Sequence, residues 1–265
     1  MLRTVTSHLS MQVHAPADLV LAVTVAQGAY DVDETLSVTR DGAPVAVREI
    51  VGPHGTRLHR FDSDPGQVEV DYRAVVTGRD AAPVVEEIDV VEYLRPSRYA
   101  DSDKLLAFAG DQFRGLRDRA LVDAVVDWVH GHVGYLSGSS LPTDGATDTL
   151  LKRRGVCRDF AHLVIALLRA RDVPARLAAV YAPGLTPMDF HAVVEAHVEG
   201  GWHVVDATRL APRPSLLRIA TGRDATDTAF LSTYRGEVTL RTLQVTATVD
   251  GPLPQDDGTP LLTLG

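Results

Sequence analysis

The only cysteine of this chain, Cys157, stands at the start of a segment with helical periodicity. The segment has apolar residues at the i, i+3, i+4, i+7 and i+8 spacing of a helix with one buried face. These residues are Phe160, Leu163, Val164, Leu167 and Leu168. The helix should stop before Pro174, because proline cannot continue it. Cys157 would then lie at the helix N-terminus, where free N–H groups and the helix dipole favour a thiolate, so it is a candidate nucleophile.

A cysteine nucleophile needs a general base, and the base needs a partner that fixes its orientation. Two strand-like runs follow the helix, and the dipeptide Gly200-Gly201 between them predicts a hairpin. His191 opens the first run, and Asp206 lies near the end of the second. Pairing around this turn would place Asp206 opposite about Glu195, toward the His191 end of the hairpin. A Cys-His-Asp triad is therefore a workable interpretation, whereas inert packing is the commoner role of a lone buried cysteine.

Strand-like segments fill the first 90 residues or so, and turn residues such as Asp41-Gly42 and Asp64-Pro65-Gly66 separate them. Short strands at this spacing predict an antiparallel β-sandwich. The residues that follow predict helices over 104–109 and 116–130, and strands over 175–181 and 237–249.

These elements predict an α+β protein. We expect an N-terminal β-sandwich-like domain over residues 1–95 and a helix-plus-antiparallel-sheet domain over residues 96–265. The stretch from 91 to 103 carries turn and helix-start signals, so we expect it to be loop-like and sensitive to proteases.

Composition narrows the class of partner. The net charge is −9 and the pI is near 5.5, which argues against nucleic acid, because phosphate binding needs a basic face. A single cysteine cannot form an intramolecular disulfide, so the fold does not need an oxidising compartment. The sequence shows neither a signal-peptide pattern nor the long apolar run of a membrane span. We therefore expect a cytoplasmic protein without a membrane partner, and the oligomeric state stays open.

Several segments together resemble the bacterial transglutaminase-like superfamily of papain-like cysteine enzymes. They are Gly155-Val156-Cys157-Arg158-Asp159-Phe160-Ala161-His162, Val173-Pro174-Ala175-Arg176, His191-Ala192, Asp206-Ala207-Thr208 and Gly222-Arg223-Asp224-Ala225. The strand-rich first 90 residues are similar to the β region that often precedes the core in bacterial members. The resemblance implies a papain-like core in which Cys157 is the nucleophile, His191 the base and Asp206 the group that orients it. It also makes Tyr135 a candidate oxyanion donor beside the Cys157 N–H.

The reaction implied by this resemblance is acyl transfer from a carboxamide of a peptide or protein. Water as the acceptor gives a peptidase or amidase, which we favour slightly, and an amine gives a transglutaminase. The alternative is a catalytically inactive transglutaminase-like binding or scaffold module. No cofactor is expected, and no metal site, because His197 and His203 lack the spacing of zinc ligands. We expect His162 to be a core histidine, and the helix dipole alone accounts for Asp159.

Overall fold

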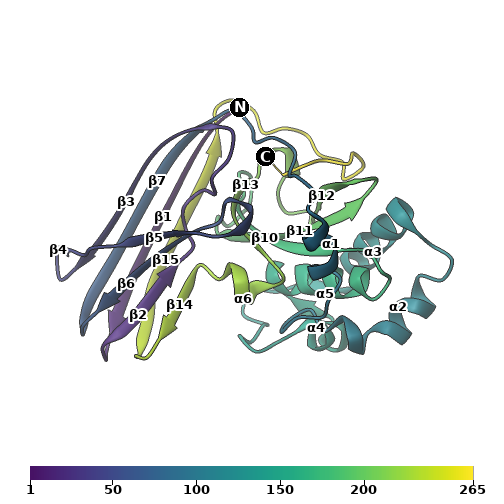
Figure 1. Ribbon diagram of the computed structural model, residues 1–265, viewed down its shortest axis with the longest axis horizontal. Helices are drawn as coiled ribbons and strands as arrows, with labels where there is room; N and C mark the ends of the chain where they lie inside the picture. The colour runs from purple at the N-terminus through teal and green to yellow at the C-terminus, as the bar shows by residue number, and fades with distance from the viewer. Residues whose placement is uncertain (265) are drawn as a thin grey trace.

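Two antiparallel sheets packed face to face form one half of the molecule in the computed structural model, which describes residues 1–264 (Figure 1). The first sheet has the strand order β15-β1-β7-β3-β4, and the second has the order β14-β2-β6-β5. The strands of the first sheet are β1 (Leu2–Val13), β3 (Asp31–Arg40), β4 (Ala43–Pro44), β7 (Gly66–Thr77) and β15 (Val238–Val249). Those of the second are β2 (Ala17–Leu21), β5 (Arg48–Val51), β6 (Arg57–Ser63) and β14 (Leu231–Tyr234).

The alternation of side chains along these strands explains the sandwich. In β7, Val68, Val70 and Tyr72 are buried while the residues between them are partly or fully exposed. β1 alternates in the same way, and its buried face meets Leu19 and Leu21 of β2 in one apolar core. Each sheet therefore turns one apolar face inward and one polar face to solvent.

The other half of the molecule is a four-stranded antiparallel sheet, of order β12-β11-β10-β13, with helices packed against it (Figure 1). Its strands are β10 (Ala175–Tyr181), β11 (Phe190–Val198), β12 (Gly201–Val205) and β13 (Leu217–Gly222). The α-helices are α1 (Glu87–Glu92), α2 (Leu106–Gln112), α3 (Asp118–His132), α4 (Ala146–Lys152), α5 (Cys157–Arg169) and α6 (Ala225–Thr228). Single-turn helices lie at Pro53–Gly55, Ser102–Lys104 and Arg213–Ser215, and β8 (Gly134–Tyr135) pairs in parallel with β9 (Arg154–Gly155).

Helix α5 is central to this half, because 11 of its 13 residues are buried. It packs against β11, α3 and α4. The α+β class, with a β-sandwich followed by helices packed on an antiparallel sheet, is confirmed. Within residues 1–264, no helix combines the length and the apolar character that a membrane span requires.

The C-terminal strands differ from the expected division of the chain. The sequence places residues 231–249 in the second domain, yet β14 pairs with β2, and β15 pairs with β1 over most of its length. In Figure 1 the yellow-green β14 and β15 accordingly run beside the purple β1 and β2. The physical reason is that β1 has an open edge, which the alternating β15 covers. A boundary near residue 95 and its protease sensitivity stay predictions.

After β15 the chain crosses back to the second half, and we call residues 250–264 the C-terminal strap (Figure 1). The Val204 N–H of β12 donates to the Leu262 carbonyl over 2.7 Å, and Leu264 is buried. Asp256 makes a two-pronged ion pair of 2.8 Å contacts with Arg213, whose Nη1 donates to the Val204 carbonyl over 3.0 Å. The strap thus holds the free edge of the sheet beside the end of β12.

Asp256→Asn should destabilise the protein by about 3 kcal/mol, because it leaves the buried Arg213 guanidinium without its charged partner. The pair holds the pKa of Asp256 down to about 2 through the Arg213 hydrogen bond. Its stabilisation should therefore be present above about pH 4 and be lost as the pH falls through 2. Urea unfolding at pH 7 measures the effect, with Asp257→Asn as the control that removes a charge one residue along. Equal free energies of unfolding for the two variants would contradict this role.

Candidate active site

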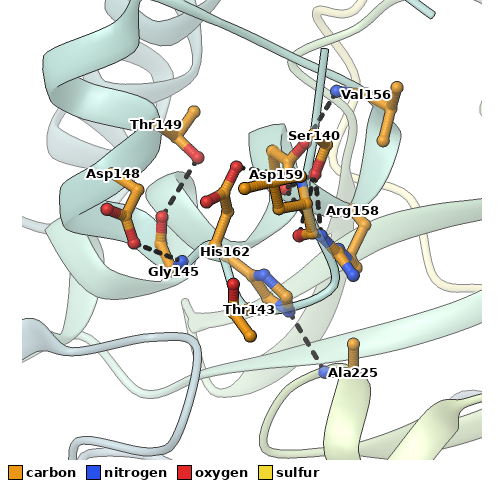
Figure 2. Close-up of polar contacts among 12 residues, drawn as sticks. Ser140, Thr143, Gly145, Asp148, Thr149, Val156, Arg158, Asp159, His162 and Ala225 are labelled. Carbon is orange, nitrogen blue, oxygen red and sulfur yellow. Dashed lines mark hydrogen bonds and ion pairs between the residues drawn. The ribbon is translucent and has the colours of Figure 1, made fainter. Parts of the chain in front are cut away.

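The start of helix α5 is built around the Asp159 carboxylate, which is only 1% exposed. Its Oδ2 accepts the Val156 N–H over 2.9 Å, and its Oδ1 accepts the Ser140 hydroxyl over 2.9 Å. Figure 2 shows Ser140 and Arg158 converging on this carboxylate, with the Arg158 Nη2 atom 2.7 Å from the Ser140 Oγ. The helix dipole is therefore not the whole account of Asp159, because it also ties the loop after β8 to the turn that carries Cys157.

Gly155 allows this arrangement, because a Cβ atom there would lie 2.6 Å from the Asp159 Cβ. We expect Gly155→Ala to destabilise the protein by roughly 1–3 kcal/mol, since the crowded atom belongs to a stiff, buried part of Asp159. Gly131→Ala is the matched control: a Cβ at Gly131 in α3 meets nothing within 4 Å, and alanine favours helix. Thermal unfolding compares the two. A Gly155→Ala protein as stable as Gly131→Ala would show that the close packing of Asp159 is not required.

His191 and Asp206 meet at the ends of neighbouring strands. The His191 side chain is completely buried near the start of β11, and its Nε2 lies 2.8 Å from the Asp206 Oδ2. The other Asp206 oxygen, Oδ1, accepts the backbone N–H of Thr208 over 2.8 Å and its hydroxyl over 2.7 Å. Three contacts therefore fix the carboxylate, which in turn fixes the imidazole.

The hairpin register brings these two residues closer than the sequence predicted. The turn is formed by Glu199 and Gly200, with φ of 51° and 79°, rather than by Gly200-Gly201. Positive φ at both central positions defines the type I′ turn that suits a two-residue hairpin loop. Val194 consequently faces Val205, so Asp206 follows opposite Val193 instead of opposite Glu195.

His191 and Asp206 stabilise each other in their ionised forms. Burial alone would lower the pKa of His191, but the charge of Asp206 and its hydrogen bond outweigh burial and raise that pKa to about 10. Burial would likewise raise the pKa of Asp206, and the neighbouring His191 together with the Thr208 hydrogen bonds lowers it instead. At neutral pH the pair is therefore an imidazolium held by a carboxylate.

Cys157 is only partly buried, and it lies close enough to His191 for its side chain to raise the pKa of that residue. This contribution is smaller than that of Asp206. Since Asp206 occupies Nε2, the buried Nδ1 is the ring nitrogen left for Cys157, and within residues 1–264 it has no hydrogen-bond partner. The three residues are thus brought together in the order sulfur, imidazole and carboxylate.

Tyr135 lies close to Cys157. Its strand β8 pairs with β9 so that Tyr135 stands beside Gly155, and 46% of the residue is exposed. Burial of the hydroxyl and the charge of Cys157 raise the pKa of Tyr135 to about 12, and the Cys157 backbone N–H acts against that shift. The Tyr135 hydroxyl therefore lies beside the Cys157 N–H, and the role of the two groups as oxyanion donors stays a prediction.

His162 does not extend this site. His162 is completely buried, stacks on Tyr99 with 5.2 Å between ring centroids, and accepts the Ala225 N–H at its Nε2 over 3.1 Å (Figure 2). Burial lowers the pKa of His162 to about 3, so it is a neutral core histidine. In residues 1–264, no three or more His, Cys, Asp and Glu side chains gather as metal ligands would.

Two positioning residues were missed from the sequence. Thr208 follows Asp206 by two residues, and an Asx-type turn at this spacing would have pointed to it. Ser140 gave no such signal, because it lies 19 residues before Asp159 in a glycine- and serine-rich loop.

Comparisons with known proteins agree with this geometry. The transglutaminase-like superfamily profile matches residues 110–207, which include Cys157, His191 and Asp206. A crystal structure of a protein from Cytophaga hutchinsonii, provisionally named a cysteine protease, is 34% identical with a TM-score of 0.88 and covers 98% of this chain and 96% of its own. The chain belongs to the transglutaminase-like superfamily.

Mycobacterial relatives of this transglutaminase-like protein include an uncharacterized protein of Mycobacterium leprae. It is 27% identical over 216 residues, which are 74% of this chain and 76% of the relative. An uncharacterized protein of Mycobacterium tuberculosis is 37% identical over 91 residues, which are 33% of this chain and 27% of the relative. The resemblance to the Cytophaga protein thus covers both halves of the molecule, whereas the second mycobacterial match covers one third of it.

Proposed function

We propose that the protein is a cysteine-dependent acyltransferase that acts on a carboxamide of a peptide or protein, with water as the principal acceptor. The observation that carries the proposal is the His191–Asp206 pair, buried beside the first residue of helix α5, which is Cys157. A catalytically inactive scaffold has no need of a buried charged pair in which one histidine nitrogen, Nδ1 of His191, has no hydrogen-bond partner within residues 1–264. The provisional name of the Cytophaga relative, a cysteine protease, supports water as the acceptor.

In the first half of the reaction, the Cys157 thiolate attacks the carbonyl carbon, and a carbon–sulfur bond forms. The negative charge moves to the carbonyl oxygen, where the Cys157 N–H and the Tyr135 hydroxyl can donate to it. The His191 imidazolium gives its Nδ1 proton to the nitrogen of the substrate, the carbon–nitrogen bond breaks, and an amine leaves. The product of this half is a thioester on Cys157 and a neutral His191.

In the second half, water enters and gives a proton to His191 as its oxygen attacks the thioester carbon. The carbon–sulfur bond breaks, the carboxylic acid leaves, and the thiolate–imidazolium pair returns. An amine in place of the water would yield a new amide by the same steps. Asp206 holds the ring orientation throughout and stays ionised.

A substrate screen tests the proposal. The purified protein is incubated with a library of peptide amides, with and without a primary amine, and the products are identified by mass spectrometry. Hydrolysis adds the mass of water and releases an amine, whereas transfer adds the mass of the amine and releases ammonia or the leaving amine. We expect products that are absent with Cys157→Ser. A protein that processes none of these amides, and whose Cys157 reacts no faster than a free thiol, would contradict the proposal.

A further inference from the structure

The short strand β8 has one paired edge and one free edge. On the paired edge, the Gly134 N–H donates to the Arg153 carbonyl over 2.9 Å. The Leu136 N–H donates to the Gly155 carbonyl, also over 2.9 Å, so alternate residues of this segment bond to β9. Successive residues of a strand turn their backbone groups to opposite edges. The N–H and C=O of Tyr135, between these two residues, therefore point away from β9.

The free edge of β8 is open to solvent. β8 and β9 form a two-stranded sheet, and in the chain from 1 to 264 no hydrogen bond joins the backbone N–H or C=O of Tyr135 to another group. Gly134 and Tyr135 are exposed, and so is Leu136 after them. Buried backbone groups are nearly always paired, so these unpaired groups face water. None of the three residues is a charged residue or a proline, which are the types that often block the edge of a sheet.

This edge lies beside the nucleophile. Gly155, the residue paired with Tyr135, comes two positions before Cys157. The Tyr135 ring also contacts Phe160 in the first turn of helix α5, with 5.9 Å between the ring centroids. Each residue of an extended chain spans about 3.3 Å. A chain held at Tyr135 therefore needs only a few residues to bring an amide to the Cys157 sulfur.

We propose that the acyl donor binds as an extended peptide that adds a third strand to β8 and exchanges main-chain hydrogen bonds with Tyr135. This inference rests on the proposed function, because it names the form of substrate that the same site takes. An N–H and a C=O side by side on a strand edge are complementary to another extended backbone. A side-chain carboxamide on a folded surface offers no such backbone. The substrate class is therefore an unfolded segment of a peptide or protein, recognised through its main chain.

Alkylation of Cys157 tests the pairing without amide turnover. The reagents are acetyl-tetra-alanyl chloromethyl ketone and four versions of it, each with one backbone nitrogen methylated. Because Cys157 is the only thiol, whole-protein mass follows the rate, and reaction with free cysteine corrects for intrinsic reactivity. The Tyr135 carbonyl can accept from one N–H of the reagent. We therefore expect methylation at one position to slow alkylation about three- to tenfold, and at the other positions to change it little.

Tyr135→Pro and Tyr135→Ala are a matched pair of variants that test the N–H of the protein. Both remove the Tyr135 hydroxyl, and only proline removes the N–H as well. Proline is tolerated on a strand edge whose N–H faces solvent, so both variants should fold, which thermal unfolding checks. The unmethylated reagent should alkylate Tyr135→Pro about three- to tenfold more slowly than Tyr135→Ala. Chloroacetamide has no peptide chain to pair, so it should react equally with both.

The outcomes separate this inference from the proposed function. An effect of methylation at one position, in a protein that turns over no amide, would contradict the proposed function and support the pairing. Equal alkylation rates across the methylated series would overturn the pairing, whether or not amides are turned over. Equal rates for folded Tyr135→Pro and Tyr135→Ala would overturn it as well, and if the proline variant did not fold, the methylated series would decide alone. A Cys157 that reacts with none of the reagents would contradict both.

Discussion

Cys157→Ser is expected to lower amide turnover by at least about a thousandfold, because a serine hydroxyl in this setting is a far weaker nucleophile than a thiolate. The residue is only partly buried and the two side chains are nearly the same size, so the fold should be unaffected. Turnover and the thermal unfolding temperature are measured on the same preparation.

Cys157→Ala is the companion variant, which removes the nucleophile without adding a hydroxyl. Both variants should unfold within a few degrees of wild type and should be equally inactive. Activity that survived either substitution in a folded protein would rule out Cys157 as the nucleophile.

Asp206→Asn should reduce kcat about 10³- to 10⁴-fold, because an amide no longer stabilises the imidazolium or fixes its tautomer. It should also move the alkaline limb of the pH–activity profile to lower pH. The reason is that the negative charge of Asp206 raises the pKa of His191 to about 10, so without it the imidazolium loses its proton at lower pH. Activity that needs this proton for the leaving amine would therefore fall earlier as the pH rises.

The measurement is kcat/KM of the wild type and the variant between pH 5 and 10, in steps of half a unit. Asparagine keeps an oxygen for the Thr208 contacts, so the local backbone should be retained. Asp64→Asn, in the sandwich and paired with Arg40 at 3.1 Å, removes one charge far from the site and is the control. An alkaline limb at the same pH in wild type and Asp206→Asn would contradict the coupling of the two residues.

Helix α5 and strand β10 show where sequence reasoning works well. The apolar stripe of α5 is strong, its first residue is the predicted Cys157, and the helix ends at Arg169, before Pro174 as expected. Strand β10 has the predicted bounds, because a proline precedes it and an apolar run defines it.

The partner of β15 could not be predicted in the same way. Alternation along β15 shows which face is buried, but it does not show which strand lies alongside. The hairpin turn lies one residue earlier than the glycine pair predicts, because Glu199 adopts the left-handed conformation that the turn requires.

In the candidate site, too, some residues could be predicted from the sequence and others could not. Cys157, His191 and Asp206 could be proposed from local patterns and from the resemblance, because each lies at the end of a periodic element. Ser140 has no local pattern, and its relation to Asp159 depends on how the loop after β8 folds over the start of the helix. Such contacts between distant segments follow from tertiary packing alone.

Intact-mass spectrometry of the protein during turnover tests the central claim most directly. A slowly hydrolysed ester or amide is mixed with the protein, and the mass is followed from milliseconds to minutes. We expect one acyl group per chain, attached at Cys157 and lost at the rate of product formation, and no adduct with Cys157→Ser. Product formation without an adduct at Cys157, or an adduct that persists through many turnovers, would contradict a thioester mechanism at this residue.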